Sequence, residues 1–445
     1  MSSAIKSTRV VTPEGVLPAT VVIEDGCIAS VMTGETGLPV SAVQDVGSLV
    51  VSPGLVDCHV HINEPGRTEW EGFATATQAA AAGGVTALVD MPLNSLPVTT
   101  TADALAQKLA ASEQQRYVDV GFWGGVVPDN ADELGALADA GVLGCKAFLV
   151  HSGIAEFPNS TRADLARALP ILRDAGIPLL AHAELDLGAH VSEPDPRAYR
   201  GYLQSRPNAW EDRAIELLVE LCRETRCPVH IVHLSSASSL DTLRRAKDEG
   251  LPVSAETCPH YLCIEAEAIP DGATEYKCAP PIREHDNRER LWQGLFEGVI
   301  DFVVTDHSPC SPQLKKQDLG VFAEAWGGIA SLSLGLSTVW TEAARRGATL
   351  EQLVRWMSAG PARFAGLARK KGALARGFDA DLVVWDPDAS FEVAPQRLFF
   401  RHKLSPYLAR TQRGIVHSTF LRGQRVFDGD AFPAGPIGRA LLHRS

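Results

Sequence analysis

An apolar stretch, Gly54-Leu55-Val56-Asp57-Cys58-His59-Val60-His61, carries a polar side chain at every second position near its end. Residues two apart in a β-strand point to the same face, so a strand here directs Asp57, His59 and His61 to one side. On their own, the two histidines fit two interpretations equally well. They are either structural, hydrogen-bonded imidazoles or the start of a metal site, and the other strands of the chain decide between the two.

Seven further strand-like stretches follow, and helical stretches rich in alanine, leucine and glutamate separate them. We expect strands at residues 86–91, 118–124, 144–150, 178–183, 229–234, 253–257 and 302–305, and helices at residues 73–82, 162–175, 211–223 and 238–247. This alternation predicts an α/β protein with a (β/α)8 TIM-like barrel at residues 52–366. A doubly wound open sheet is the alternative, but no glycine-rich phosphate loop follows any of these strands.

The two ends of the chain differ from the middle, because they contain short β-rich runs broken by Pro, Gly and Asp. Residues 20–25 are an example near the N-terminus, and residues 381–386 and 419–426 are examples near the C-terminus. This pattern is typical of hairpins rather than of strand–helix units. We therefore expect residues 1–51 and 367–445 to form one small composite β-sandwich domain.

Composition excludes several classes of protein. The 445 residues include 41 Lys plus Arg and 54 Asp plus Glu, and the net charge of −13 argues against nucleic acid or an anionic membrane as a partner. The sequence contains no run of roughly 18 apolar residues, so we expect no membrane span. The nine cysteines include no Cys-x-x-Cys pair, so we expect buried thiols in a reducing compartment. Because the N-terminus has no apolar signal core, we expect a cytoplasmic protein.

Residues of metal-ligand type also stand at or near the ends of four other predicted strands. Lys146 lies in the fourth strand, His182 and His233 in the fifth and sixth, and Asp306 follows the eighth. Active sites of such barrels lie at the carboxyl ends of the strands, where these side chains would meet the two histidines of the first strand. For Lys146 the alternative is a lysine whose charged end reaches the surface. Four imidazoles, one carboxylate and one lysine together favour a divalent-metal site.

Lys146 would be a poor ligand while protonated, but a good one if CO₂ converted it to an N6-carboxylated lysine. This carbamate is anionic and can bridge two metal ions. The two histidines of the first strand would hold one ion with Asp306, and His182 and His233 would hold the other. A hydroxide bridging two such ions is a nucleophile at neutral pH, because bound water can acidify to about pH 7. We expect Zn²⁺, while Co²⁺, Mn²⁺ and Fe²⁺ also fit these ligands.

Several motifs resemble those of the cyclic amidohydrolase branch of the amidohydrolase superfamily. They are Pro53-Gly54-Leu55-Val56-Asp57-Cys58-His59-Val60-His61, Cys145-Lys146-Ala147-Phe148, Thr257-Cys258-Pro259-His260-Tyr261-Leu262, Thr305-Asp306-His307-Ser308-Pro309 and residues 377–386. The resemblance covers nearly the whole chain. It implies that the metal ligands are His59, His61, Lys146, His182, His233 and Asp306.

Within this branch the chain is most similar to the allantoinase family. The similarity is carried by residues 61–73, Met91-Pro92-Leu93-Asn94, Gly121-Phe122-Trp123-Gly124-Gly125 and Lys277-Cys278-Ala279-Pro280-Pro281-Ile282-Arg283. It implies hydrolysis of the hydantoin ring of allantoin to allantoate, as in purine degradation. By analogy with relatives, it also implies a homo-oligomer, a tetramer.

Three neighbouring groups are the alternatives. Hydantoinase- and dihydropyrimidinase-type enzymes typically carry a tyrosine five positions after the metal lysine, where this chain has His151. Dihydroorotases carry an arginine that binds the substrate carboxylate at the position of Asn63. Some relatives have lost the metal ligands and serve as scaffolds, whereas this chain keeps every ligand.

The resemblance implies that Asp306 is the general base and proton shuttle, and a carboxylate that only binds metal is the alternative. Asn63 and Asn94 are candidate contacts to the substrate, because an amide side chain both donates and accepts hydrogen bonds; loop capping is the alternative. Cys278 is a candidate contact through its backbone N–H and C=O. We expect His151 to be a solvent-facing loop residue.

Overall fold

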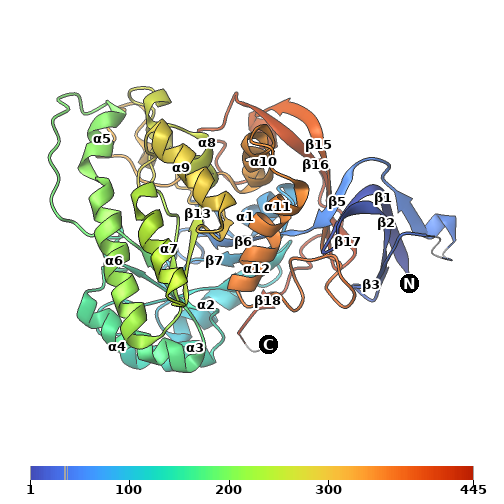
Figure 1. Ribbon diagram of the computed structural model, residues 1–445, viewed down its shortest axis with the longest axis horizontal. Helices are drawn as coiled ribbons and strands as arrows, with labels where there is room; N and C mark the ends of the chain where they lie inside the picture. Colours follow the sequence, from blue (N-terminus) through green and yellow to red (C-terminus); the bar gives the residue numbers. More distant parts are fainter. Residues whose placement is uncertain (1, 35–36, 38, 444–445) are drawn as a thin grey trace.

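The computed structural model describes residues 2–34, 37 and 39–443 (Figure 1). The strands in the middle of the chain are short and almost entirely buried. They are β6 (Leu55–Val60), β7 (Val85–Asp90), β8 (Asp119–Phe122), β9 (Gly124–Gly125), β10 (Cys145–Phe148), β11 (Leu179–His182), β12 (Val229–Ile231), β13 (Val253–Thr257) and β14 (Phe302–Val303). We call these strands the parallel layer.

Within the parallel layer, neighbouring strands pair in parallel in two separate runs. One run of pairs joins β6, β7 and β8, and a second joins β9 through β14. Only Trp123 separates β8 from β9 along the chain. An isolated parallel bridge between Val60 and His307 joins β6 to the segment after β14. The succession of pairs therefore returns to its first strand, and the carboxyl ends of the strands face the same way.

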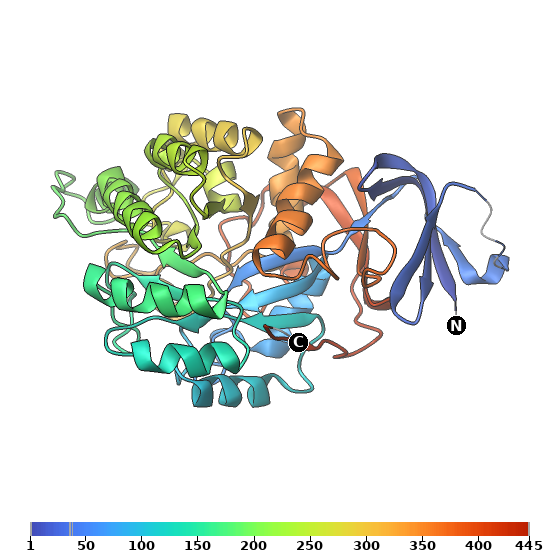
Figure 2. The ribbon, with the colours of Figure 1, turned by 60° about the horizontal axis from the view of Figure 1, so that its bottom comes forward.

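Helices connect the strands and cover the parallel layer (Figures 1 and 2). They are α1 (Phe73–Ala82), α2 (Ala102–Ser112), α3 (Leu134–Asp139), α4 (Arg162–Ala175), α5 (Tyr199–Ser205), α6 (Asn208–Thr225), α7 (Leu240–Asp248), α8 (Pro259–Cys263), α9 (His285–Phe296), α10 (Gly335–Arg345), α11 (Leu350–Val354) and α12 (Gly360–Phe364). The predicted α/β class is confirmed, and α1 and α4 have the predicted bounds.

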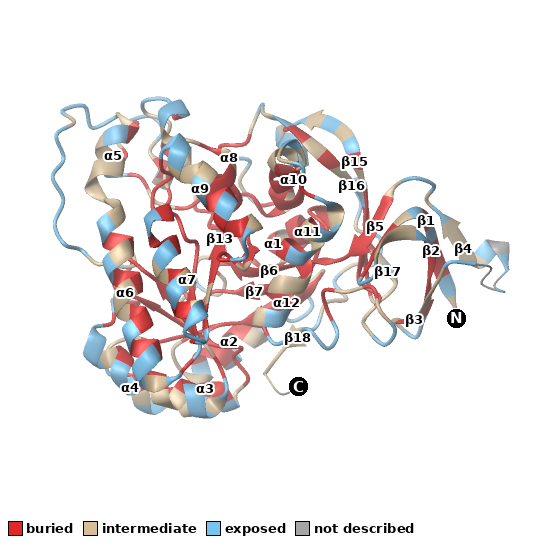
Figure 3. Cartoon of the chain, in the orientation of Figure 1, coloured by how far each residue is buried: buried red, intermediate tan, exposed pale blue. Residues whose placement is uncertain are grey.

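Helix α4 shows how the local sequence sets these bounds. Thr161 and Asp164 form a reciprocal capping box at its start, and Gly176 ends it with a φ of 75°. Its buried residues recur every three or four positions, as expected for one apolar face: Leu165, Ala168, Leu169 and Leu172. Figure 3 shows the same division, with buried inner faces and exposed outer faces on the surrounding helices.

The two ends of the chain meet in one sheet beside the parallel layer. Its strands are β1 (Ser3–Thr12), β2 (Gly15–Glu24), β3 (Cys27–Met32), β4 (Val43–Asp45), β5 (Val50–Pro53), β15 (Leu382–Glu392), β16 (Thr411–Leu421) and β17 (Gln424–Asp428). They run in the order β17-β16-β15-β5-β1-β2-β3, with β4 on β1. Antiparallel pairing of Val51 with Val384 joins the N-terminal and C-terminal parts, and the apolar residues Ile23, Leu382 and Val384 pack in one cluster. The last strand, β18 (Ala440–Leu441), instead pairs in parallel with β8.

A buried lysine fastens the parallel layer to this sheet. The Nζ atom of Lys371 lies 2.6 Å from carboxylate oxygens of both Asp119 and Asp381 and 2.8 Å from Asp379. Arg422 also donates to Asp119, at 2.6 and 2.8 Å. Because Asp119 begins β8 while the other four residues lie between positions 371 and 422, these ion pairs cross between the two parts. The lysine ammonium occupies the space among the three carboxylates.

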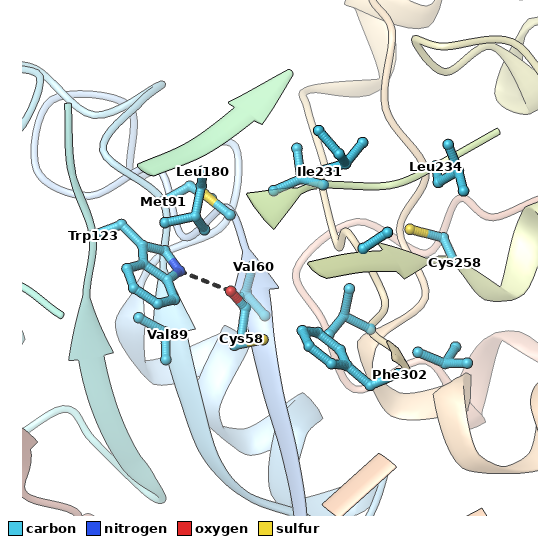
Figure 4. Close-up of a cluster of buried hydrophobic side chains, with 14 of the residues drawn as sticks. Cys58, Val60, Val89, Met91, Trp123, Leu180, Ile231, Leu234, Cys258 and Phe302 are labelled. Carbon is cyan, nitrogen blue, oxygen red and sulfur yellow. Dashed lines mark hydrogen bonds between the residues drawn. The ribbon is translucent and has the colours of Figure 1, made fainter. Parts of the chain in front are cut away.

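Apolar packing closes the interior beneath the carboxyl ends of the strands (Figure 4). The indole nitrogen of Trp123 donates to the Cys58 carbonyl at 2.8 Å, which ties β6 to the segment between β8 and β9. His230 of β12 stacks on Phe302 of β14, with ring centroids 5.1 Å apart. All nine cysteines are free thiols, as predicted. Among the described residues, no helix is long and apolar enough to cross a membrane.

Candidate metal centre and pocket

The structure brings the six predicted ligands together at the carboxyl ends of their strands, and all six are buried. His59 Nε2 lies 3.1 Å from Asp306 Oδ1 and 3.2 Å from Lys146 Nζ. His61 Nε2 lies 3.5 Å from the same Asp306 oxygen. These four side chains form one half of the candidate centre.

His182 and His233 form the other half. His182 Nδ1 lies 3.0 Å from His233 Nε2, and the ring centroids of His233 and His59 are 5.3 Å apart. The two halves therefore adjoin, with the Lys146 amine beside the first of them. The division of the six ligands between two metal ions stays a prediction.

Two of the six predicted ligands, His233 and Asp306, lie further beyond the ends of their strands than predicted. Strand β12 ends at Ile231 rather than at residue 234, and β14 ends at Val303 rather than at residue 305. His233 and Asp306 then adopt φ values of 40° and 44°. This left-handed backbone breaks the strand pairing and is uncommon outside glycine, and such strain is often found at functional sites.

The outward-facing ring nitrogens of three histidines are each held by an oxygen. His59 Nδ1 lies 2.5 Å from Glu256 Oε1, His61 Nδ1 donates to the Leu93 carbonyl at 2.9 Å, and His182 Nε2 lies 2.6 Å from Glu184 Oε2. A proton on each outer nitrogen leaves a lone pair on the inner one, and this is the state that binds metal. These partners therefore orient His59 and His61 toward Asp306, and His182 toward His233.

Burial changes the pKa values of the charged groups in the centre. Burial raises the pKa of Asp306, but the neighbouring His59 and the hydrogen bonds from His59 and His61 hold that pKa well below its usual range. Burial lowers the pKa of Lys146 to about 8, and this outweighs the opposing attraction of Asp306 and Glu256. Asp306 is therefore an anion at neutral pH, and the Lys146 amine is far easier to deprotonate than an exposed lysine.

The residues present fit divalent metal ions. The donor set contains four imidazoles, one ionised carboxylate and one amine, and imidazole and carboxylate donors suit Zn²⁺, Co²⁺, Mn²⁺ and Fe²⁺. His59, His233 and Asp306 offer ligand atoms that all lie within 4.8 Å of one another. His182 Nδ1 and His233 Nε2 also face each other at 3.0 Å, so both nitrogens lie beside one position.

A cavity of about 290 Å³ opens above the centre. Besides the ligands, its walls include Asn94, His151, Tyr202, Arg206, Lys277 and Trp326. Asn94 thus lies where the sequence predicts a substrate contact, and the exposed His151 lies on the pocket wall.

Asn63 and Cys278 are not on the pocket wall. Asn63 lies behind Asn94, accepting from its Nδ2 at 3.4 Å and donating to the Pro309 carbonyl at 3.3 Å. The Cys278 carbonyl accepts a hydrogen bond from the Tyr202 hydroxyl at 2.6 Å. Contact of Asn63 and Cys278 with substrate stays a prediction.

Asp57 shares a strand face with the two histidines but lies outside the candidate centre. Its carboxylate accepts from the Thr305 hydroxyl at 2.6 Å and from the His59 N–H at 3.2 Å. Asp57 therefore connects β6 to the residue before Asp306. His307 turns away, with Nε2 3.2 Å from Glu71.

Sequence reasoning missed Glu184, Glu256 and Arg206. Glu256 carries a detectable signal, because it lies within a buried strand, two residues after Ser254 and four residues before His260. Glu184 follows His182 by two residues, which is the spacing of one strand face. Arg206 lies 22 residues further along the chain, and no local pattern points to its pairing with Glu184.

Comparison with known proteins adds independent evidence. Residues 50–426 match the model of the amidohydrolase family. The chain is 50% identical over 440 residues to an allantoinase of Streptomyces avermitilis, covering 98% of each chain. It is 44% identical over 458 residues to an allantoinase of Saccharomyces cerevisiae, covering 99% of this chain and 98% of the relative.

Solved structures of hydantoinases and dihydropyrimidinases have a similar fold. An L-hydantoinase (dihydropyrimidinase) from Arthrobacter aurescens superposes with a TM-score of 0.92 at 28% identity, and all of each chain is covered. A dihydropyrimidinase from Brevibacillus agri gives a TM-score of 0.88 at 25% identity, again over all of each chain.

Proposed function

This chain belongs to the amidohydrolase family, and from that premise we propose that it hydrolyses the hydantoin ring of allantoin to allantoate. The observation that carries the proposal is the convergence of six ligand-type side chains beneath the pocket. The allantoinase relatives match along nearly their full length, which supports this substrate over other cyclic amides.

We propose that the parallel layer is a (β/α)8 barrel of residues 52–366, and that residues 1–51 and 367–445 form the β-sandwich domain. The closing bridge between Val60 and His307 supports the barrel, and the shared sheet supports the composite domain. A homotetramer and a cytoplasmic location stay predictions.

We propose two divalent ions, with zinc as the expected metal and an N6-carboxylated Lys146 between the two halves. His59, His61 and Asp306 would hold one ion, and His182 and His233 the other. When bound, such ions polarise a carbonyl oxygen and acidify water. The buried, easily deprotonated amine of Lys146 supports carboxylation, because only the neutral amine reacts with CO₂.

Asp306 moves the proton in this reaction. As a buried anion beside His59 and His61, it accepts a proton from the attacking water as the new C–O bond forms. It then returns this proton to the ring nitrogen as the amide C–N bond breaks. The ring opens to a ureido group and a carboxylic acid, the acid loses the second proton of the water to solvent and becomes a carboxylate, and Asp306 is an anion again.

The cationic side chains around the pocket already have hydrogen-bond partners, and this favours a neutral substrate. Arg206 is paired with Glu184, and Arg67 donates to the Asn94 carbonyl at 2.6 Å. Lys277 donates to the Ala325 carbonyl at 2.6 Å. A substrate carboxylate such as that of dihydroorotate would compete with these contacts, whereas the neutral amide of Asn94 suits a ureido group.

A substrate panel on the zinc-loaded protein tests this function. Allantoin, hydantoin, dihydrouracil and dihydroorotate are compared by kcat/KM, with Asp306→Asn as the inactive control. We expect allantoin to be preferred by a wide margin. Turnover of hydantoin or dihydrouracil without turnover of allantoin would overturn the proposal and favour a hydantoinase-type enzyme.

A further inference from the structure

The side chain of Arg67 connects segments that follow different strands of the parallel layer. Arg67 itself lies in the segment after β6. Its Nη1 atom donates to the Asn94 carbonyl at 2.6 Å, in the segment after β7, and its Nη2 atom lies 3.4 Å from Glu156, in the segment after β10. Each of these segments also supplies residues to the pocket wall. One guanidinium therefore joins several parts of that wall.

Trp70 extends this connection to the segment after β14. The guanidinium carbon of Arg67 lies 5.3 Å from the centroid of the Trp70 ring, within the range of a cation–π contact. The buried Trp70 packs edge-on against Trp326, with ring centroids 4.9 Å apart. Trp326 lies on the pocket wall. Arg67 therefore acts on this wall through the ring of Trp70 as well.

Packing, rather than hydrogen bonding, holds the Trp326 ring in place. Its indole nitrogen is buried and has no hydrogen-bond partner among the described residues. A Cβ atom added to Gly153 would lie 3.4 Å from Trp326 Cη2, so the ring also lies close to the Gly153 backbone. Because no hydrogen bond fixes the ring, its position depends on neighbours such as Trp70.

Asn94 contributes a neutral amide to the pocket wall. Within the described part of the chain, its side chain makes one hydrogen bond, from Nδ2 to Asn63 Oδ1 at 3.4 Å. Its Oδ1 atom and its second N–H are therefore left for a ligand. An amide accepts from an N–H and donates to a C=O, and a ureido group offers both. The backbone carbonyl of this same residue is the acceptor for Arg67.

The ring and the substituent of allantoin make different demands on the pocket. The scissile ring amide must reach the candidate metal centre, and hydantoin has the same ring. Only the ureido substituent distinguishes the two compounds, so a wall that discriminates between them must contact that substituent. Asn94 offers polar groups and Trp326 offers a flat aromatic surface to a planar, neutral ureido group.

We propose that Arg67 is a positioning residue that fixes Asn94 directly and Trp326 through Trp70, and so makes the pocket selective for a cyclic amide with a ureido substituent. This rests on the proposed function. Arg67 acts through these neighbours and does not touch the substrate. Its pair with the half-exposed Glu156 contributes little to the role, because water screens such pairs.

The test compares allantoin with hydantoin in Arg67→Met, a variant that keeps an unbranched side chain but cannot donate to the Asn94 carbonyl. We expect kcat/KM for allantoin to fall roughly 10- to 100-fold, as for loss of a hydrogen bond from a charged donor, and that for hydantoin to change less than about threefold. If hydantoin turnover is too slow to measure, its inhibition constant against allantoin replaces kcat/KM. Arg162→Met, at an exposed pair with Glu224, is the matched control and should leave both values unchanged.

Three further variants separate the contacts of Arg67. Glu156→Gln removes only the outer pair, so both substrates should be hydrolysed at nearly wild-type rates. Trp70→Leu removes the ring that lies against Arg67 and Trp326, and we expect the same selective loss with allantoin. Arg67→Lys keeps a cationic donor and should recover part of the selectivity. Zinc per chain should match the wild type in every variant, because the side-chain contacts of Arg67 in the described part of the chain do not include the six candidate ligands.

The outcomes separate this inference from the proposed function. Equal losses with both substrates in Arg67→Met, or an unchanged rate with allantoin, would overturn the role of Arg67 and leave allantoin hydrolysis standing. If Arg67→Met does not fold, Trp70→Leu decides, and an unchanged ratio between the two substrates would overturn the role. A wild-type protein that hydrolyses hydantoin but not allantoin would refute the proposed function and this inference together.

Discussion

Carboxylation of Lys146 should occur in the metal-free protein at neutral pH, because burial lowers the pKa of this amine from 10.5 to about 8. In the experiment, labelled bicarbonate is added to metal-free protein over a range of pH. The neutral amine attacks CO₂, a C–N bond forms, and one proton leaves to give the anionic carbamate.

The size of the expected effect on carbamate formation follows from the fraction of the Lys146 amine that is neutral. At pH 7, a pKa of about 8 leaves roughly one amine in eleven neutral, against roughly one in 3,000 for an unperturbed lysine. The reactive neutral form is therefore roughly 300-fold more abundant at Lys146 than at exposed lysines, so carbamate should form preferentially at Lys146, and the rate should level off above about pH 8.

Carbon NMR of the labelled carbamate is the assay, before and after addition of zinc. Lys277 is the matched comparison, because burial lowers its pKa to about 8 as well, but it lies outside the six candidate ligands. Zinc should retain the Lys146 carbamate after CO₂ is removed, and this signal should vanish in Lys146→Met and survive in Lys277→Met. A retained signal in Lys146→Met, or none in zinc-loaded wild type, would refute the reasoning.

Three further outcomes are expected. Asp306→Asn should lower kcat at least about 100-fold with little change in substrate binding, measured by steady-state kinetics and calorimetry; near wild-type turnover would exclude the proton shuttle. Lys371→Met should destabilise the fold by about 3–5 kcal/mol in denaturant unfolding, because buried carboxylates lose their cation, while Lys6→Met, at an exposed pair, should leave stability nearly unchanged. The kcat/KM for allantoin should exceed that for dihydroorotate at least about 10³-fold, since an unpaired buried charge costs roughly 4 kcal/mol, and comparable values would contradict the preference for a neutral substrate.

Much of the candidate centre could be predicted from local sequence, because each ligand lies at or just beyond the end of its own strand. The period of two places His59 and His61 on one face, and parallel strands bring their carboxyl ends to one side of the layer. The strand ends near His233 and Asp306 were predicted too late, since their left-handed backbone has no glycine to signal it.

The sequence by itself therefore determined which side chains could bind metal and where in the parallel layer they would lie. Only the tertiary structure decided which side chains hydrogen-bond to these ligands and to their partners. Glu256 reaches His59 across 197 positions, and Arg206 reaches Glu184 from beyond a different helix. Strand periodicity acts between residues two apart, whereas a buried carboxylate takes its partner from whichever element packs against it, and that choice is made only when the whole chain is folded.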